Sequence, residues 1–128
     1  MMRIDHVAFW VRDLEKMRAF YQEFFGMSCG ERYENSAKGF TSYFLSFKEG
    51  DRIEIMHKTD HQTKVDQSVL LGFTHLAISV GSKQRVDELT ELIRSMGYEI
   101  IGEPRYTGDG YYESVISDPE GNHIEITE

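Results

Sequence analysis

The sequence has little of several residue types, and each shortage excludes a class of protein. Its 128 residues include a single cysteine, Cys29, which excludes an internal disulfide and a zinc site built on cysteines. Two prolines and no low-complexity segment leave no obvious linker between domains. No apolar run approaches the roughly 20 residues of a membrane helix, and the N-terminus lacks the apolar stretch of a signal peptide. We therefore expect a cytoplasmic protein with no membrane segment.

Positive charge is also scarce. The chain carries 14 Lys and Arg against 22 Asp and Glu, a formal net charge of −8. A surface of this sign repels nucleic acid and anionic membranes, so a nucleic-acid-binding function is excluded. The 40% of apolar residues is typical of a globular domain with a core of its own.

The chain contains two copies of one sequence pattern. His6 and His75 each lie two residues before an alanine, in an apolar run that ends in valine. Glu54 and Glu125 each lie in an Ile-Glu-Ile segment. The separations are similar, 75 − 6 = 69 and 125 − 54 = 71 residues. A repeat of this length indicates one structural unit that occurs twice.

We predict a single domain, 1–128, made of two repeats at about 1–66 and 72–128. Neither repeat alone could bury much apolar surface, so the copies are expected to pack together. Each repeat predicts the order β-α-β-β-β, because an alternating run precedes a helical pattern and three strand-like runs follow it. The predicted strands after the helices are 27–33, 41–47 and 52–57, then 98–105, 111–117 and 122–127.

The two predicted helices have recognisable ends. Asp13 and Ser82 are candidate N-caps, and Gly26 and Gly97 stand where the helices should end. The apolar stripes that should face the core are Leu14, Met17, Phe20, Tyr21, Phe24 and Phe25, then Val86, Leu89, Leu92, Ile93 and Met96.

Strand alternation predicts where the polar residues point. His6, Ala8 and Trp10 share one face of the first strand, and the opposite face is apolar and suits the helix. The same alternation places Glu54, His75 and Glu125 on faces away from the helices. A lone histidine in a strand is usually structural. Because both repeats carry a histidine and a glutamate at equivalent positions, the pattern instead favours a metal site, provided that the two faces are turned towards each other.

Imidazole and carboxylate together suit divalent Zn, Ni, Co, Mn or Fe. Four protein ligands on an ion that prefers six would leave two positions for water or for two substrate oxygens. His123 shares a face with Glu125 and is the strongest rival ligand, although a supporting or structural role ranks first for it.

The repeated unit resembles the vicinal oxygen chelate superfamily, which is the glyoxalase, bleomycin resistance and dioxygenase family. The segments that carry the resemblance are Ile4–Ala8, Phe20–Tyr21, Phe25–Met27, Gly72–Ala77 and Asp118–Glu125. It implies an α+β fold in which two tandem βαβββ modules form an open curved mixed sheet around a metal cleft. It also implies a homodimer that shares its metal sites between chains.

The four-residue set His6, Glu54, His75 and Glu125 is similar to that of glyoxalase I, so the resemblance implies one divalent ion per site and a lactoylglutathione lyase-like activity. The substrate would be a small 2-oxo compound or a hemithioacetal, converted through an enediolate at the metal. Glu54 or Glu125 would be the catalytic group that moves the proton.

Two positions depart from the glutathione-using members. Trp10 stands where they carry an arginine, and Lys58 stands where they carry an asparagine. Arg12, Lys48, Lys58 or Arg105 could bind a different anion, although a solvated charge is the commoner role. The alternatives are a thiol-transferase, a dioxygenase, an epimerase, or a protein that sequesters a small molecule.

Several other residues carry weaker signals. His57 and His61 lie near the connection between the repeats and are predicted to be solvent-exposed, and Cys29 is predicted not to be a nucleophile. Gly108-Asp109-Gly110 could cover a cleft, but a hairpin turn is the simpler expectation.

Overall fold

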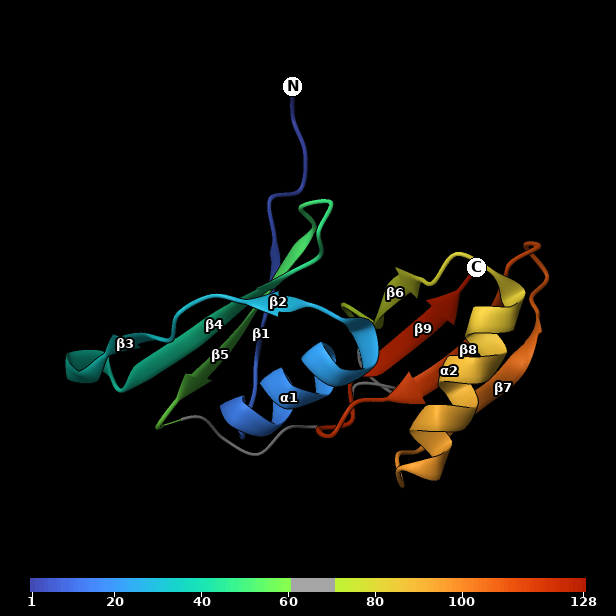
Figure 1. Ribbon diagram of the computed structural model, residues 1–128. Helices are drawn as coiled ribbons and strands as arrows, with labels where there is room; N and C mark the ends of the chain where they lie inside the picture. The colour runs from blue at the N-terminus through green and yellow to red at the C-terminus, as the bar shows by residue number, and fades with distance from the viewer. Residues whose placement is uncertain (61–70) are drawn as a thin grey trace. The chain divides into compact units, whose positions relative to one another are not determined.

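The computed structural model describes residues 1–60 and 71–128, and the chain divides into two compact units, Met1–Lys64 and Val65–Glu128. Each unit holds one long helix beside one β-sheet (Figure 1). In the first unit the elements are β1 (Val7–Trp10), α1 (Leu14–Phe25), β2 (Ser28–Cys29), β3 (Tyr33–Asn35), the 3-10 helix η1 (Ser36–Lys38), β4 (Phe40–Ser46) and β5 (Arg52–Lys58). In the second they are β6 (His75–Ser79), α2 (Lys83–Ser95), β7 (Ile100–Tyr106), β8 (Tyr112–Ser117) and β9 (His123–Thr127).

The two units share one topology, which confirms the predicted repeat of β-α-β-β-β. The strand order is β1-β5-β4-β2 in the first sheet and β6-β9-β8-β7 in the second. In each sheet the first strand pairs in parallel with the last, and the other pairings are antiparallel. Each opening strand is therefore a sheet edge, and the strand that carries the predicted glutamate is its only neighbour on the path.

The predicted strand 27–33 is wrong as a single strand. β2 pairs Cys29 with Leu45, and β3 pairs Tyr33 with Ser42, both on β4. Three residues, 30–32, thus lie opposite two, 43–44, and this mismatch interrupts the ladder as a bulge does. The amide of Gly30 still donates to the Phe44 carbonyl at 3.0 Å, which keeps the interrupted strand against β4.

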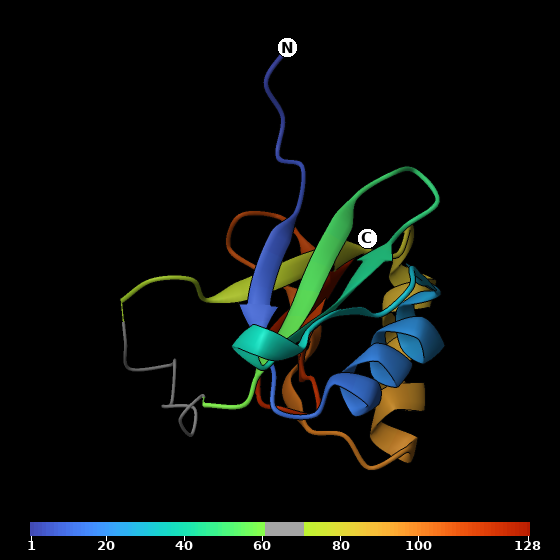
Figure 2. The ribbon, with the colours of Figure 1, turned by 90° about the vertical axis from the view of Figure 1, so that its left-hand side faces the viewer.

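Helix α1 has the predicted ends. The Asp13 carboxylate accepts a hydrogen bond from the Lys16 amide at 3.0 Å, and Gly26 closes the helix in the left-handed region with φ 65°. The helix lies on one side of its sheet (Figure 2). Its buried residues match the predicted stripe except at the end, where Phe25 is half-buried: Leu14, Met17, Phe20, Tyr21 and Phe24.

Helix α2 packs on β7, β8 and β9 through a stripe that differs from the prediction. Leu92 and Met96, expected in the core, are each 49% exposed. Thr90 is fully buried instead, and its hydroxyl bonds to the Val86 carbonyl (2.6 Å) and the Ser114 hydroxyl (2.7 Å). A helix turns about 100° per residue, so Leu92 lies well away from the line of buried positions. The remaining buried residues of the stripe are Val86, Leu89 and Ile93.

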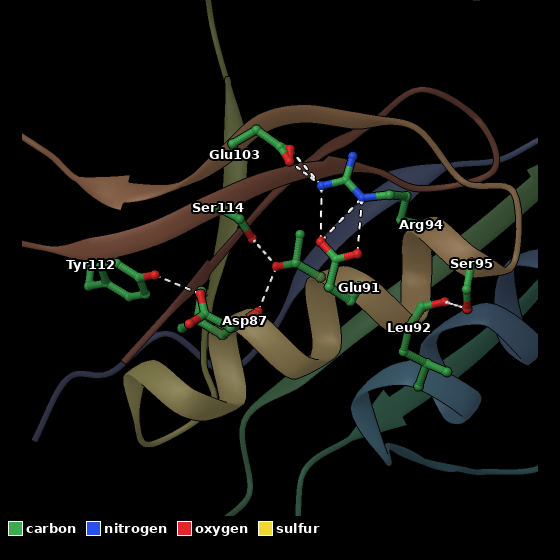
Figure 3. A network of polar contacts seen from close by, with 10 residues as sticks. Asp87, Glu91, Leu92, Arg94, Ser95, Glu103, Tyr112 and Ser114 are labelled. Atoms are coloured by element: carbon green, nitrogen blue, oxygen red, sulfur yellow. Dashed lines mark hydrogen bonds and ion pairs between the residues drawn. The ribbon is translucent and has the colours of Figure 1, made fainter.

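Polar contacts fasten both ends of α2 to its sheet (Figure 3). The Tyr112 hydroxyl donates to Asp87 at 2.6 Å, and Arg94 bonds to both Glu91 and Glu103. Apolar side chains and the buried Thr90 and Ser114 hydroxyls thus share the same helix–sheet contact, because these two hydroxyls bond to each other. No helix within residues 1–60 and 71–128 is long and apolar enough to cross a bilayer.

Candidate metal centre

The first unit brings His6 and Glu54 together. Ala8 on β1 pairs with Glu54 on β5, so His6, two residues before Ala8, lies diagonally next to Glu54 on one face. The His6 Nε2 atom lies 3.6 Å from Glu54 Oε1. The side chains keep 34% and 16% of their surface exposed, so the pair is partly shielded yet open to a ligand.

The imidazole of His6 is oriented by its neighbours. Its Nδ1 atom lies 2.9 Å from a carboxylate oxygen of Asp5, which also accepts a hydrogen bond from Arg52. These hydrogen bonds, the one with His6 first, lower the pKa of the Asp5 carboxyl. The ring also meets Phe44 edge-on, with centroids 5.0 Å apart. A histidine held through Nδ1 by a carboxylate presents Nε2 as an electron-pair donor, the arrangement that metal ligands use.

The second unit repeats the pair with His75 and Glu125. Ala77 pairs with Glu125 as Ala8 does with Glu54. The His75 Nε2 atom lies 3.1 Å from Glu125 Oε1, with 37% and 21% of the side chains exposed. The repeated register therefore explains why both pairs have the same arrangement: a histidine at the start of, or just before, an edge strand, beside a glutamate on the adjacent parallel strand.

A second carboxyl group, missed by the sequence reasoning, supports Glu125. Glu113 on β8 is only 6% exposed, and its carboxyl group lies near enough to Glu125 to feel its charge. Burial, followed by the charge of Glu125, raises the pKa of Glu113. The strand pattern could have placed Glu113 on this face, because Val115, two residues on, pairs with Glu125. Its burial could not be predicted.

The structure thus supplies the four predicted residues as two pairs. Within the described residues, no group of three or more His, Cys, Asp and Glu side chains is placed to hold a metal ion. His123 pairs in register with His75, but no such group includes it. The convergence of all four residues on one ion therefore stays a prediction.

The other candidates fall outside these pairs. His57 is half-buried on β5, where its Nδ1 lies 2.9 Å from the Val11 carbonyl, so the prediction of an exposed residue is wrong. His61 lies outside the described residues. Burial raises the pKa of the Cys29 thiol, which disfavours a nucleophile. The segment around Asp109 is a hairpin turn, in which the Thr107 amide donates to the Tyr111 carbonyl.

Two of the basic residues suggested as anion ligands, Lys58 and Arg105, have protein partners. The Lys58 ammonium lies 3.9 Å from Asp60, and Arg105 donates to the Glu113 carbonyl at 3.1 Å. Neither contact excludes a bound anion, and neither residue belongs to a His–Glu pair.

Two β-α-β-β-β units, each with a histidine–glutamate pair on the face away from its helix, define a class of repeated α+β proteins. Residues 3–126 match the sequence profile of the Glyoxalase/Bleomycin resistance protein/Dioxygenase superfamily. The chain belongs to this superfamily, as the sequence resemblance predicted.

Known relatives carry glyoxalase names. The chain is 29% identical over 125 residues to a lactoylglutathione lyase of Arabidopsis thaliana. The aligned region covers 97% of this chain but only 43% of the plant protein. A probable lactoylglutathione lyase of Vibrio cholerae is 26% identical and is covered to 88%. Among solved structures, a glyoxalase I mutant from Zea mays gives a TM-score of 0.82 at 26% identity, covering 98% of this chain and 44% of that one. The chain thus spans less than half of these plant relatives.

Proposed function

We propose that this protein is a metal-dependent lyase of the lactoylglutathione lyase type, which acts on a small 2-oxo compound or hemithioacetal. The observation that carries the proposal is the repeated pair of His Nε2 beside a carboxylate, at 3.6 and 3.1 Å. Membership of the superfamily and the names of the relatives from Arabidopsis and Vibrio support it. We further propose a cytoplasmic homodimer that shares its metal sites between chains.

The proposed metal ligands are His6, Glu54, His75 and Glu125. Two imidazoles and two carboxylates fit a divalent ion of the Zn, Ni, Co, Mn or Fe group, and the Asp5 contact fixes His6 in the orientation that a ligand needs. When bound, the ion would supply a Lewis acid that stabilises negative charge on two adjacent substrate oxygens.

The two glutamates are proposed to move the substrate proton between adjacent carbons. They differ in their surroundings: Glu125 lies near the buried carboxyl group of Glu113, whereas Glu54 lies opposite Phe44 in the sheet. A carboxylate beside a buried second carboxyl group has less room to move. We therefore assign the larger movement, and the main role as base, to Glu54.

The test is isomerisation of the hemithioacetal of methylglyoxal and glutathione by protein stripped of metal and reloaded separately with Ni, Co, Zn or Mn. We expect one of these ions to restore turnover. Glu54→Gln should lower kcat by at least about 100-fold, the usual contribution of a general base. Glu49→Gln, an exposed glutamate in a turn, is the matched control and should retain wild-type turnover. Absence of turnover with every metal, repeated with other thiols, would contradict the proposal.

A further inference from the structure

Aromatic side chains line the same sheet face as His6 and Glu54. Trp10 meets Phe40 edge-on at 6.0 Å between centroids, and Phe40 meets Tyr33 at 5.9 Å. We call this connected row, Trp10, Phe40 and Tyr33, the aromatic wall. Phe44, two residues along β4 from Ser42, continues the aromatic surface to His6. The wall and the histidine–glutamate pair therefore occupy one continuous face.

The second unit shows that the fold does not require an aromatic residue at the positions of Trp10 and Tyr33. The first strands and the last strands of the two sheets pair in the same register, and the pairs Tyr33–Ser42 and Arg105–Glu113 occupy equivalent places, so wall residues can be compared between the copies. Trp10 corresponds to Ser79 and Tyr33 to Arg105, because each is paired with an equivalent partner. Phe40, two residues before Ser42, corresponds to Tyr111, two residues before Glu113. Two of the three wall positions are thus polar in the second copy, although its topology is the same.

The wall is both exposed and preorganised. Trp10 is 47% exposed and Tyr33 55%, although aromatic rings in a core are normally buried. Ser42 lies between Trp10 and Tyr33 on the same face and is only 1% exposed. Neighbouring side chains therefore cover the sheet at this point, and the aromatic rings form the outer surface. Edge-to-face contacts hold the rings in place, which lowers the entropic cost of binding.

We propose that the aromatic wall binds an aryl or similarly bulky apolar group of the substrate, next to the site where His6 and Glu54 act. This inference rests on the proposed function, because it makes the substrate a 2-oxo or 2-hydroxy compound with an apolar substituent. The wall determines substrate specificity. It takes no part in proton transfer.

The test compares mandelate with lactate. Both carry adjacent carboxylate and hydroxyl oxygens, and they differ by a phenyl ring in place of a methyl group. Trp10 is the only tryptophan of the chain, so its fluorescence reports directly on the wall. We expect mandelate to quench Trp10 and to bind about tenfold more tightly than lactate, since the ring removes more apolar surface from water.

Variants assign the preference to the wall. By titration calorimetry, Trp10→Ala should abolish the preference for mandelate, and Trp10→Phe should restore most of it. Tyr33→Ala keeps the tryptophan and should weaken the quenching. Leu92→Ala is the control, because Leu92 is an apolar residue of almost the same exposure, 49%, on helix α2.

Three results would overturn the inference: equal binding of mandelate and lactate, a preference that survives Trp10→Ala, or a Trp10→Ala variant that changes only the oligomeric state. The last would make the wall an interface between copies. Metal titration separates this inference from the proposed function. A protein that binds no divalent ion but whose Trp10 is still quenched by mandelate would refute the metal site and support the wall.

Discussion

At the scale of single residues, the orientation of His6 depends on its neighbour in the sequence. Asp5 lies 2.9 Å from His6 Nδ1, and Arg52 holds the same carboxylate. Alternation along the strand could predict which face His6 occupies, but not that Asp5 turns back to meet it. The same limit applies to Glu113, whose burial depends on how β7, β8 and β9 pack.

Removing the Asp5 carboxylate should weaken metal binding without loss of the fold. We expect Asp5→Asn to lower the affinity for a divalent ion by about 10- to 100-fold, the usual effect of losing the partner of a metal-bound histidine. Competition with a fluorescent chelator measures the affinity. Asp51→Asn, at an exposed turn, should leave it unchanged. An unchanged affinity in Asp5→Asn would show that His6 is no ligand or needs no such support.

The buried hydroxyl of Tyr43 predicts a pH-dependent stability. It donates to Glu15 at 2.7 Å, and this bond is the main reason why the pKa of Glu15 is lowered. Because folding lowers the pKa of Glu15, the ionised carboxylate stabilises the fold at pH values above its pKa in the unfolded chain, about 4.3. This stabilisation is lost as the pH falls through the pKa of Glu15 in the folded protein.

We therefore expect Tyr43→Phe to cost about 1 kcal/mol at pH 7, a value reduced for the exposure of Glu15, and less as the pH falls below the unfolded pKa of Glu15. Urea unfolding of both proteins from pH 3 to 7 measures the difference. A cost that did not change with pH would mean that the ring packing of Tyr43, not its bond to Glu15, had been altered.

At the scale of elements, local sequence signals predicted most of the structure. Asp13, Ser82 and Gly26 act at the helix ends as their chemistry predicts. The errors arise where tertiary packing decides. Pairing with β4 splits the strand at 27–33, and the Thr90–Ser114 hydrogen bond places Thr90, rather than Leu92, in the core.

The end of α1 gives a direct test of this reasoning. Gly26 has φ 65° and nothing within 4 Å of an added Cβ, so Gly26→Ala introduces backbone strain without a clash. We expect a loss of about 1 kcal/mol in the free energy of unfolding. Gly30→Ala is the control, because Gly30 has no positive φ and its Cβ would meet only the Phe44 carbonyl at 3.9 Å. Equal effects of the two substitutions would contradict the assignment of Gly26 as a left-handed cap.

At the scale of the whole molecule, the repeat accounts for both the fold and the candidate site. Because the two units share one strand register, a histidine and a glutamate placed in equivalent positions form the same pair twice. The sequence was sufficient to predict each pair, since alternation and the repeat determine the face. Whether the two pairs act on one ion depends on packing between units and chains, which strand patterns do not encode.

Metal stoichiometry tests the central claim most directly. Titration calorimetry of the metal-free protein with Ni or Zn should give one ion per chain. His6→Ala and His75→Ala should each abolish that binding, because both histidines would hold the same ion. Two ions per chain, or a variant that loses one pair yet binds one ion with the original affinity, would show that the pairs act separately and would contradict the account.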